Sequence, residues 1–268
     1  MQKRPALAGH RRGSGPPLLV LPGLGSTWAE FEAVLPLLAD RYDVLALDLP
    51  GQGESPPLPP DVVPDVAALT DAVEHELTQR GVDVPHVLGV SLGARVGLEL
   101  ARRQCARSVV AIAPVGPVTP PERVYQALVL AASRFAFGVL APAADLVLRF
   151  PLARTAALLP LRARGWRASP EEAAALVRAF AHAPDFWRLL RYAVAPEHQL
   201  DHTAVRCPVV VAQGTHDLIS LSQAARLAAL VPGARFRLLP LAGHSSVGDV
   251  PESVVRLVDE AVADAAGA

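Results

Sequence analysis

A strand, a sharp turn and a helix meet at His86–Ala94, and this stretch constrains the fold more than any other part of the chain. Within it, Gly89 and Gly93 flank Ser91 in the pattern Gly-x-Ser-x-Gly. Such a turn strains the backbone at the serine, and a Cβ at either flanking position would collide with its neighbours. It also lifts the hydroxyl above the sheet, beside N–H groups that can hold an oxyanion. The pattern predicts a serine nucleophile, although five residues alone also fit an ordinary glycine-containing loop.

Short apolar runs alternate with helical patterns on both sides of this turn. All-apolar runs are typical of parallel strands that are buried on both faces. Strands are expected at residues 18–21, 43–47, 86–90, 108–113, 208–212 and 235–239. Helices are expected from Ser26 or Thr27 to about Leu38, and at residues 66–80, 92–104, 222–230 and 252–263. The alternation predicts an α/β fold, in which right-handed crossovers build a mostly parallel sheet with helices on both faces.

The alternation of strand and helix patterns stops between residues 117 and 205. Strand patterns disappear there, and Ala, Leu, Arg and aromatic residues recur at helical spacing between single prolines. This segment is therefore expected to be a helical insertion in the α/β core.

The charge balance disfavours several classes of partner. Of the 268 residues, 25 are basic and 26 are acidic, and 51% are hydrophobic. A chain of this length and composition can bury a large core. Its net charge of −1 provides no uniform field that would attract nucleic acid or an anionic membrane. The expected partner is a small molecule that is neutral or apolar.

The cysteines and the apolar stretches indicate a cytoplasmic protein without a metal site or a membrane span. Cys105 and Cys207 are far apart and lack Cys-x-x-Cys spacing, so free thiols are expected. The basic start of the chain runs into Gly13–Pro17 and not into the apolar region of a signal peptide. The most apolar helical stretch, Tyr125–Leu140, falls short of the roughly 20 apolar residues of a membrane span. A buried or ligand-facing helix is expected there.

An acid and a base for the serine follow two later strands. Asp217 comes directly after the fifth expected strand, and His244 comes after the sixth. The carboxyl ends of parallel strands meet at one edge of a sheet, so both side chains are expected near Ser91. The serine needs a base to take its proton, and the base needs an anion to hold its tautomer. His216 is rejected as the base because adjacent side chains in extended backbone point apart.

Together these residues resemble the α/β-hydrolase superfamily, whose members carry the serine turn, the acid and the histidine in this order. The resemblance implies Ser91 as nucleophile, Asp217 as orienting acid and His244 as base, without a cofactor. It covers most of the core, about residues 15–116 and 206–265. Two further patterns are similar to flanking patterns of the family: Asp48-x-x-Gly51-x-Gly53-x-Ser55, and Gly243-His244 followed by Asp249-x-Pro251.

The loop after the first core strand departs from the family pattern. Pro22-Gly23 stands where members commonly have His-Gly, so the histidine that would brace the oxyanion loop is missing. By position, the resemblance still implies that the backbone N–H groups of Leu24 and Leu92 form the oxyanion hole.

The insertion resembles the cap that many such enzymes carry over the site. This interpretation makes residues 1–116 and 206–268 the core and residues 117–205 the cap. Apolar and aromatic cap residues favour a pocket for a hydrophobic acyl or ring group, or they only hold the cap helices together. The aromatic candidates are Phe135, Phe137, Phe180, Phe186, Trp187 and Tyr192.

The leading hypothesis is a cofactor-free serine hydrolase that cleaves a carboxylic ester, or a related acyl compound, through an acyl-enzyme. Epoxide hydrolases and haloalkane dehalogenases of this fold use an aspartate nucleophile, so Ser91 argues against both. A thioesterase, a carbon–carbon bond hydrolase or a cofactor-free perhydrolase would use the same three residues. A ligand-binding protein without turnover is the alternative of another class. The sequence does not name the acyl group, the leaving group or the oligomeric state.

Overall fold

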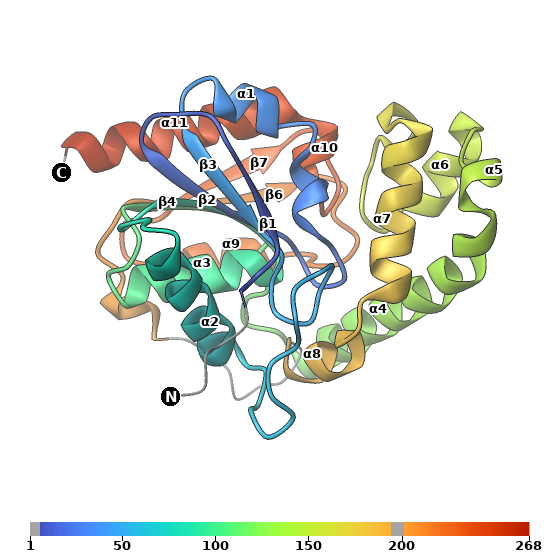
Figure 1. Cartoon of the computed structure of the whole chain (residues 1–268), viewed down its shortest axis with the longest axis horizontal. Coiled ribbons are helices and arrows are strands. Elements are labelled where there is room, and N and C mark those ends of the chain that lie inside the picture. Colours follow the sequence, from blue (N-terminus) through green and yellow to red (C-terminus); the bar gives the residue numbers. More distant parts are fainter. Residues whose placement is uncertain (1–5, 194–200, 268) are drawn as a thin grey trace.

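The fold is built on a seven-stranded sheet. The computed structural model describes residues 6–193 and 201–267, and the strands found there lie in the order β1-β3-β2-β4-β5-β6-β7 (Figure 1). β1 runs antiparallel to β3, and the other neighbouring strands are parallel. The bounds are β1 Gly9–Arg12, β2 Pro17–Leu21, β3 Asp43–Leu47, β4 His86–Val90, β5 Ser108–Ile112, β6 Val209–Gly214 and β7 Arg235–Leu239. The expected α/β fold is confirmed, with β1 as an exposed edge strand that the sequence patterns do not predict.

Helices cover both faces of this sheet. The helices of the core are α1 Leu35–Ala39, α2 Val66–Gln79, α3 Leu92–Arg102, α9 Gln223–Ala228, α10 Ser246–Asp249 and α11 Pro251–Gly267. Leu19 and Leu21 of β2 belong to the apolar cluster that α2, α3 and α9 share. Leu18 and Val20 belong to the cluster of α1 and α11. Successive side chains of a strand point to opposite faces, so each helix layer receives every second residue.

The first helical segment differs from the single helix expected over residues 26–38. The structure instead has a 3₁₀ helix, η1 (Trp28–Phe31), followed by the short α1. Pro36 explains the break, because inside a longer helix it would lack an N–H and its ring would clash with the carbonyl four residues earlier. The cap of η1 comes from another loop, where Asp48 Oδ1 accepts the Trp28 N–H at 2.7 Å. The other core elements lie within a few residues of their predicted ranges.

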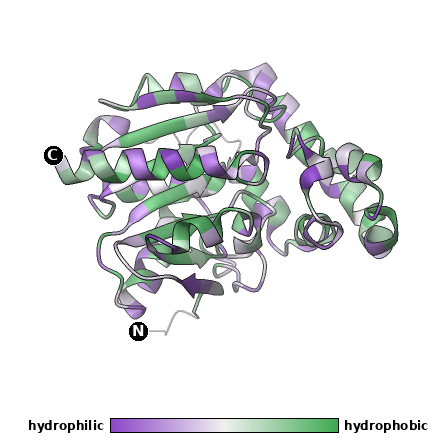
Figure 2. Cartoon of the chain, turned by 90° about the horizontal axis from the view of Figure 1, so that it is seen from above, coloured by the Kyte–Doolittle hydropathy of each residue, from purple (hydrophilic) through white to green (hydrophobic). Residues whose placement is uncertain are grey.

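Between β5 and β6, the described chain contains helices and no strand. Their bounds are α4 Pro120–Leu140, η2 Ala141–Ala143, α5 Ala144–Val147, α6 Pro151–Leu158, η3 Gly165–Arg167, α7 Pro170–His182, α8 Phe186–Ala193 and η4 His202–Ala204. Two views show α4 to α8 as a group on one side of the sheet, with α7 packed against α4, α5 and α6 (Figures 1 and 2). The division into core and cap at residues 117 and 205 stays a prediction. Residues 1–5, 194–200 and 268 of the expected ranges lie outside the described residues.

α4 differs from the buried or ligand-facing helix expected over Tyr125–Leu140. α4 begins at Pro120, and η2 and α5 continue it without a gap to Val147. In the described ranges this stretch alone is long and apolar enough to cross a membrane, by length and composition only. Only 28% of its most apolar window is buried. The expectation is therefore wrong for the outer side of α4, where residues such as Phe135 are exposed.

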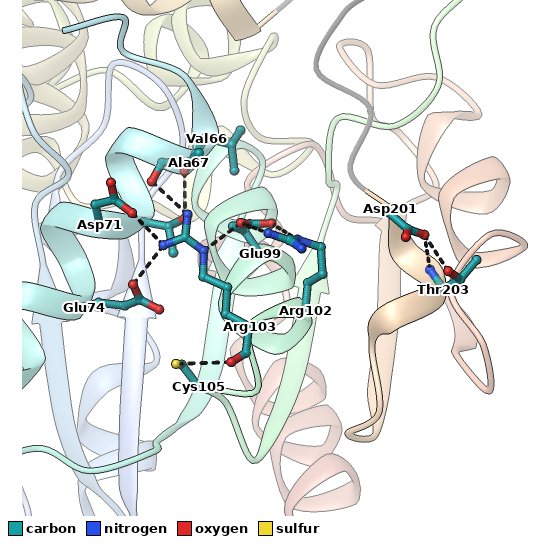
Figure 3. Close-up of polar contacts among 11 residues, drawn as sticks. Val66, Ala67, Asp71, Glu74, Glu99, Arg102, Arg103, Cys105, Asp201 and Thr203 are labelled. Carbon is teal, nitrogen blue, oxygen red and sulfur yellow. Dashed lines mark hydrogen bonds and ion pairs between the residues drawn. The ribbon is translucent and has the colours of Figure 1, made fainter.

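A buried carboxylate ties α3, which begins directly after Ser91, to α2. Glu99 is almost fully buried and accepts hydrogen bonds from Arg102 and Arg103 (Figure 3). Arg103 also binds Asp71 and Glu74 of α2, at 2.6 and 2.9 Å. Burial alone would raise the pKa of Glu99, but the two arginines outweigh it and hold the pKa below its ordinary value.

Replacing Glu99 with glutamine should weaken this connection. The uncharged amide would face two guanidinium groups, so the free energy of unfolding at pH 7 should fall by about 1–3 kcal/mol. The carboxylate stabilises the fold fully above its ordinary pKa of 4.5, and this contribution is lost as the pH falls through the lowered pKa of the folded state. In urea unfolding, the difference between wild type and Glu99→Gln should therefore shrink at acid pH.

The matched control is Glu74→Gln, which removes a more exposed carboxylate from the same arginine and should cost less than about 1 kcal/mol. If Glu99→Gln is as stable as the wild type at neutral pH, the cluster does not stabilise the contact between α2 and α3.

Candidate active site

Ser91 lies between β4 and α3 with strained backbone. Its φ of 52° and ψ of −108° fall in a region that residues with a side chain rarely adopt. The turn is anchored on both sides, because the Ser91 N–H donates to Ile112 O at 2.8 Å and the Gly93 N–H donates to Pro22 O at 3.1 Å. A Cβ at Gly93 would lie 2.2 Å from Leu21 O, so the inferred need for glycine at this position is confirmed.

Asp217 and His244 form a buried, hydrogen-bonded pair. They follow β6 and β7, and His244 Nδ1 lies 3.1 Å from each carboxylate oxygen. The carboxylate also accepts the N–H groups of Ile219 and Ser220, at 2.8 and 3.0 Å. An anion on this side favours the tautomer with its proton on Nδ1, which leaves Nε2 free to accept a proton.

The surroundings of His244 and His216 show which of the two histidines meets the acid. Ser220 Oγ lies 3.1 Å from His244 Nδ1 and donates to Ala113 O at 3.3 Å, so its oxygen faces the ring N–H. His216 is exposed, and its ring nitrogen pairs with the hydroxyl of the preceding threonine. The structure therefore brings His244, and not His216, to the carboxylate of Asp217.

The charges around His244 raise its pKa above the ordinary value. Burial alone would lower it, but the charge and hydrogen bond of Asp217 and the charge of Glu30 outweigh burial. The pKa of Asp217 is lowered: burial alone would raise it, but His244 and the N–H groups of Ser220 and Ile219 outweigh this effect. These surroundings stabilise the positive charge that the imidazole gains when it accepts a proton.

Ser91 and His244 line the same small cavity, whose volume is about 30 Å³. Its walls come both from loops at the ends of the strands and from the helical segment between β5 and β6. The lining residues are Gly23, Leu24, Gly25, Ser26, Glu30, Val90, Ser91, Leu161, Arg162, Leu176, Phe180, His244 and Ser245. The serine and the histidine, which are 153 positions apart in the sequence, thus share one space.

Only one of the six aromatic candidates of the cap lines this cavity. Phe180 does so, and Phe137 and Phe186 pack on its ring at centroid distances of 5.4 and 5.1 Å. Phe137 and Phe186 therefore do not line the cavity but support the ring of Phe180, which does. The remaining candidates lie elsewhere: Phe135, Trp187 and Tyr192.

The loop after β2 is held by two side chains whose roles the sequence does not predict. Glu30 Oε2 accepts the Gly23 N–H at 3.2 Å, and Gln52 Oε1 accepts the Gly25 N–H. The other oxygen of Glu30 accepts the hydroxyl of Ser245, directly after the catalytic candidate histidine. This buried carboxylate therefore joins the loop after β2 to the loop after β7.

Two backbone N–H groups near Ser91 donate no hydrogen bond within residues 6–193 and 201–267. One belongs to Leu24, which lies between the two anchored glycines, and the other to Leu92, the first residue of α3. Free N–H groups in these positions are what an oxyanion requires. Their assignment as an oxyanion hole stays a prediction.

Asp249 joins the histidine loop to the helical segment between β5 and β6. Its fully buried carboxylate accepts the N–H groups of Gly243, Ala163 and Arg164 at 2.8, 2.8 and 2.9 Å. A backbone hydrogen bond of 2.7 Å between Ser245 N–H and the cap carbonyl of residue 161 lies beside it. The position of the histidine loop therefore depends on this cap segment as well as on β7.

The cysteines are free, as expected, and neither lines the cavity. Burial raises the pKa of Cys207 to about 11, so its thiol stays protonated near neutral pH and is a poor nucleophile. Within the described ranges, no group of three or more His, Cys, Asp or Glu side chains is arranged to hold a metal ion.

Comparison with known sequences finds hydrolases. The model of the alpha/beta hydrolase family matches residues 18–257. The chain is 34% identical over 201 residues to the epoxide hydrolase EphH of Mycobacterium tuberculosis, which covers 72% of this chain and 92% of that protein. It is 39% identical over 92 residues to the pimeloyl-[acyl-carrier protein] methyl ester esterase of Aeromonas hydrophila, which covers 34% of each.

Comparison with solved structures finds the same fold. A thermophilic esterase from Thermogutta terrifontis superposes with a TM-score of 0.73 at 23% identity, over 97% of this chain and 93% of that chain. The enol-lactonase from Burkholderia xenovorans LB400 superposes with a TM-score of 0.74 at 20% identity, over 96% of each. These two likenesses concern the fold alone. With the family match over most of its length, the chain is a hydrolase that belongs to the alpha/beta hydrolase family.

Proposed function

We propose that the protein is a serine hydrolase that cleaves a carboxylic ester, or a related acyl compound, of a hydrophobic small molecule. The observation that supports this most directly is the buried Asp217–His244 pair beside the strained Ser91 at one cavity. A hydroxyl at the cavity and a base whose positive charge is stabilised are the requirements for attack on an acyl carbon. The proposed reaction needs no cofactor.

In the first half of the reaction, His244 Nε2 takes the proton of the Ser91 hydroxyl as the oxygen attacks the acyl carbon. The carbonyl π electrons move onto the carbonyl oxygen, where the N–H groups of Leu24 and Leu92 stabilise the negative charge. The bond to the leaving group then breaks, and the leaving group takes the proton from His244. In the second half, His244 takes a proton from a water that attacks the acyl carbon. The bond to Ser91 Oγ then breaks, Ser91 takes the proton back from His244, and the acid product leaves.

Glu30 is proposed as a positioning residue in place of the histidine that members of the family commonly carry before Gly23. Its carboxylate fixes the Gly23 N–H, which directs the neighbouring Leu24 N–H, and it also holds the Ser245 hydroxyl. One side chain thus braces the oxyanion loop and the loop of the base. Its negative charge also favours the imidazolium form of His244.

The likeness to an epoxide hydrolase does not lead to the same reaction here. A carboxylate that opens an epoxide forms an ester, which water can hydrolyse, whereas Ser91 would form an ether. An ether has no carbonyl for water to attack, so the enzyme would stay alkylated. Ser91 therefore favours an acyl substrate, and the 92-residue likeness to a methyl ester esterase supports this choice.

Other acyl reactions use the same residues. A thioesterase, a carbon–carbon bond hydrolase and a perhydrolase differ in the group that leaves or enters. A panel of esters and thioesters with one common acyl group separates a thioesterase from an esterase. A ligand-binding protein without turnover is the alternative of another class. The backbone strain at Ser91 disfavours it, because binding alone does not require a strained serine.

The decisive experiment is Ser91→Ala, assayed with a chromogenic short-chain ester. The substitution removes the attacking oxygen and no large core group, so turnover should fall about 10⁴- to 10⁶-fold while circular dichroism and Tm stay unchanged. A fluorophosphonate probe should add its mass to the wild type at Ser91 and not to the variant.

His244→Gln should lose activity as well, and His216→Gln is its matched control because that ring is exposed beside the same acid. Near-normal turnover by Ser91→Ala would exclude the mechanism. Loss of turnover in His216→Gln alone would show that His216, and not His244, is the base.

Activity should rise with pH as His244 loses its proton, since only the neutral imidazole accepts the serine proton. The midpoint of the kcat/KM profile should lie above 6.5, because Asp217 and Glu30 raise the pKa of His244 in spite of its burial. In Glu30→Gln one of these charges is gone, so the midpoint should move to lower pH. Removal of an oxyanion donor costs roughly 10²- to 10³-fold in kcat, and loss of the brace on Gly23 should cost less, about tenfold.

Glu32→Gln is the control for this variant, because Glu32 is exposed two residues further along the chain. It should leave both the midpoint and kcat unchanged. A midpoint that stays in place in Glu30→Gln would contradict the electrostatic role of this carboxylate.

Phe180 should limit the length of the acyl group. Its ring packs directly on the oxyanion loop, since a Cβ at Gly25 would lie 2.6 Å from Phe180 Cδ2. Each methylene that the pocket buries is worth about 0.8 kcal/mol, or roughly fourfold in binding. Across a series of esters, kcat/KM should rise with acyl length and then drop, and Phe180→Leu should move the maximum to longer chains. Phe135→Leu, on the exposed side of α4, should not move it, and a flat profile in all three proteins would contradict a size-limiting role.

A further inference from the structure

α4 turns its apolar side chains outward, whereas a surface helix in water turns them toward the protein. Its outward side chains are apolar: Val124, Leu128, Phe135 and Val139 are 59, 64, 75 and 68% exposed. They are spaced by four, seven and four residues and therefore lie on one face of the helix. None of the exposed residues of α4 carries a charge.

The charged side chains of α4 that make contacts face the protein. Glu122 pairs with Arg226 of α9 at 2.7 Å, and the Arg134 guanidinium lies 5.6 Å from the centroid of the Phe186 ring in α8. A helix adapted to water turns its charges outward and its apolar residues inward. The arrangement in α4 is the reverse, which indicates that something other than water covers its outer side.

The apolar surface continues beyond α4. Phe150 and Leu152, at the start of α6, are 63 and 84% exposed. The outer cap face is defined as Val124, Leu128, Phe135, Val139, Phe150 and Leu152. These helices form the side of the cap away from the sheet, with α7 between them and the core, and hydrophobic residues are frequent along them (Figures 1 and 2). Scattered exposed apolar residues are ordinary, but a group of this kind on one face marks an interaction surface.

The charge of the chain is distributed unevenly between the cap and the rest. Residues 117–193 contain ten arginines and five acidic residues, a net charge of +5, so the remainder of this chain of net charge −1 carries −6. Four of the five acidic residues are paired with arginines: Glu122, Asp145, Glu172 and Asp185. Arg149 is exposed and directly precedes Phe150. The cap is therefore basic, although the net charge of the whole protein is close to zero.

We propose that the outer cap face docks this protein on the surface of an anionic lipid bilayer, with α4 lying along the interface. Apolar side chains would enter the boundary of the acyl chains, while arginines around them meet the anionic headgroups. α4 does not need to cross the bilayer for this, and its contacts with α7 and α9 keep it on the folded protein.

A second copy of the chain fits this face less well. A two-fold contact places the same patch of both subunits opposite each other, so two caps of net charge +5 would meet. An anionic bilayer carries the opposite charge, and its attraction weakens with salt. The sign of the charge therefore favours lipid over self-association.

Docking in this orientation would place lipid one helix away from the cavity. α4 packs on α7, and Leu176 and Phe180 of α7 line the cavity that contains Ser91. A hydrophobic substrate dissolved in a bilayer would thus meet the cap first. This link to the substrate rests on the proposed function, whereas the docking itself does not.

Co-sedimentation of the full chain with large unilamellar vesicles tests the proposal. The wild type should bind vesicles of phosphatidylglycerol and phosphatidylcholine in equal parts, and the double variant Leu128→Asp/Phe135→Asp should bind at least tenfold more weakly. The matched control is Leu230→Asp/Leu238→Asp, which places the same charges at two exposed leucines of the core and should bind like the wild type. Tm and the near-ultraviolet spectrum show whether each variant is folded.

The basic side chains are tested separately. Arg149→Glu should weaken binding to the anionic vesicles, and high salt should weaken binding of the wild type in the same direction. Absence of vesicle binding by the wild type, or equal binding by Leu128→Asp/Phe135→Asp, overturns the proposal. A wild-type dimer in sedimentation velocity that this double variant disperses would assign the face to a second copy and also overturn it. None of these measurements depends on turnover, so a failure of the serine mechanism is distinguishable.

Discussion

The rest of the active site depends on the strained backbone at Ser91. A residue with a side chain in this conformation costs on the order of 1–3 kcal/mol and persists only where its surroundings fix it. Here β5 and the loop after β2 accept N–H groups of the turn, and the close approach of Gly93 to Leu21 leaves it no room to relax. α3 starts one residue later and is tied to α2 through Glu99. The sheet and its first helix layer therefore hold the serine in place before any substrate binds.

Buried carboxylates join the loops around this turn. Asp217 holds the ring of His244 and two N–H groups of its own loop. Glu30 connects the loop after β2 with the loop after β7, and Asp249 connects the loop after β7 with the cap. Hydrogen bonds to charged acceptors are about twice as strong as neutral ones, which suits them to hold segments far apart in sequence. The geometry of the site is thus set by three acids, of which only Asp217 is hydrogen-bonded to His244.

The sequence predicts the parts of the site that depend on the sheet. Parallel strands end at one edge, so the order of strand patterns was enough to bring Ser91, Asp217 and His244 together. Glu30 has no such signal, because its partner is a backbone N–H whose direction depends on the path of a loop. The break before α1 follows from Pro36, a residue whose effect the apolar spacing of the segment conceals. The outward face of α4 was not predictable either, since periodicity shows that a helix has two faces but not which of them meets the protein.

Asp249 also limits how this enzyme can be rebuilt. An inserted domain is often treated as a module that can be exchanged if its two junctions fit. Here residues 163–164, in the middle of the insertion, supply two of the three N–H donors around a buried carboxylate, and the third donor adjoins His244. A foreign insertion could join well at both ends and still offer no N–H donors to Asp249. The buried carboxylate would then lack hydrogen-bond partners, and the loop that carries His244 would no longer be held in place. The insertion and the loop that carries His244 therefore have to be transplanted, and selected, as one piece.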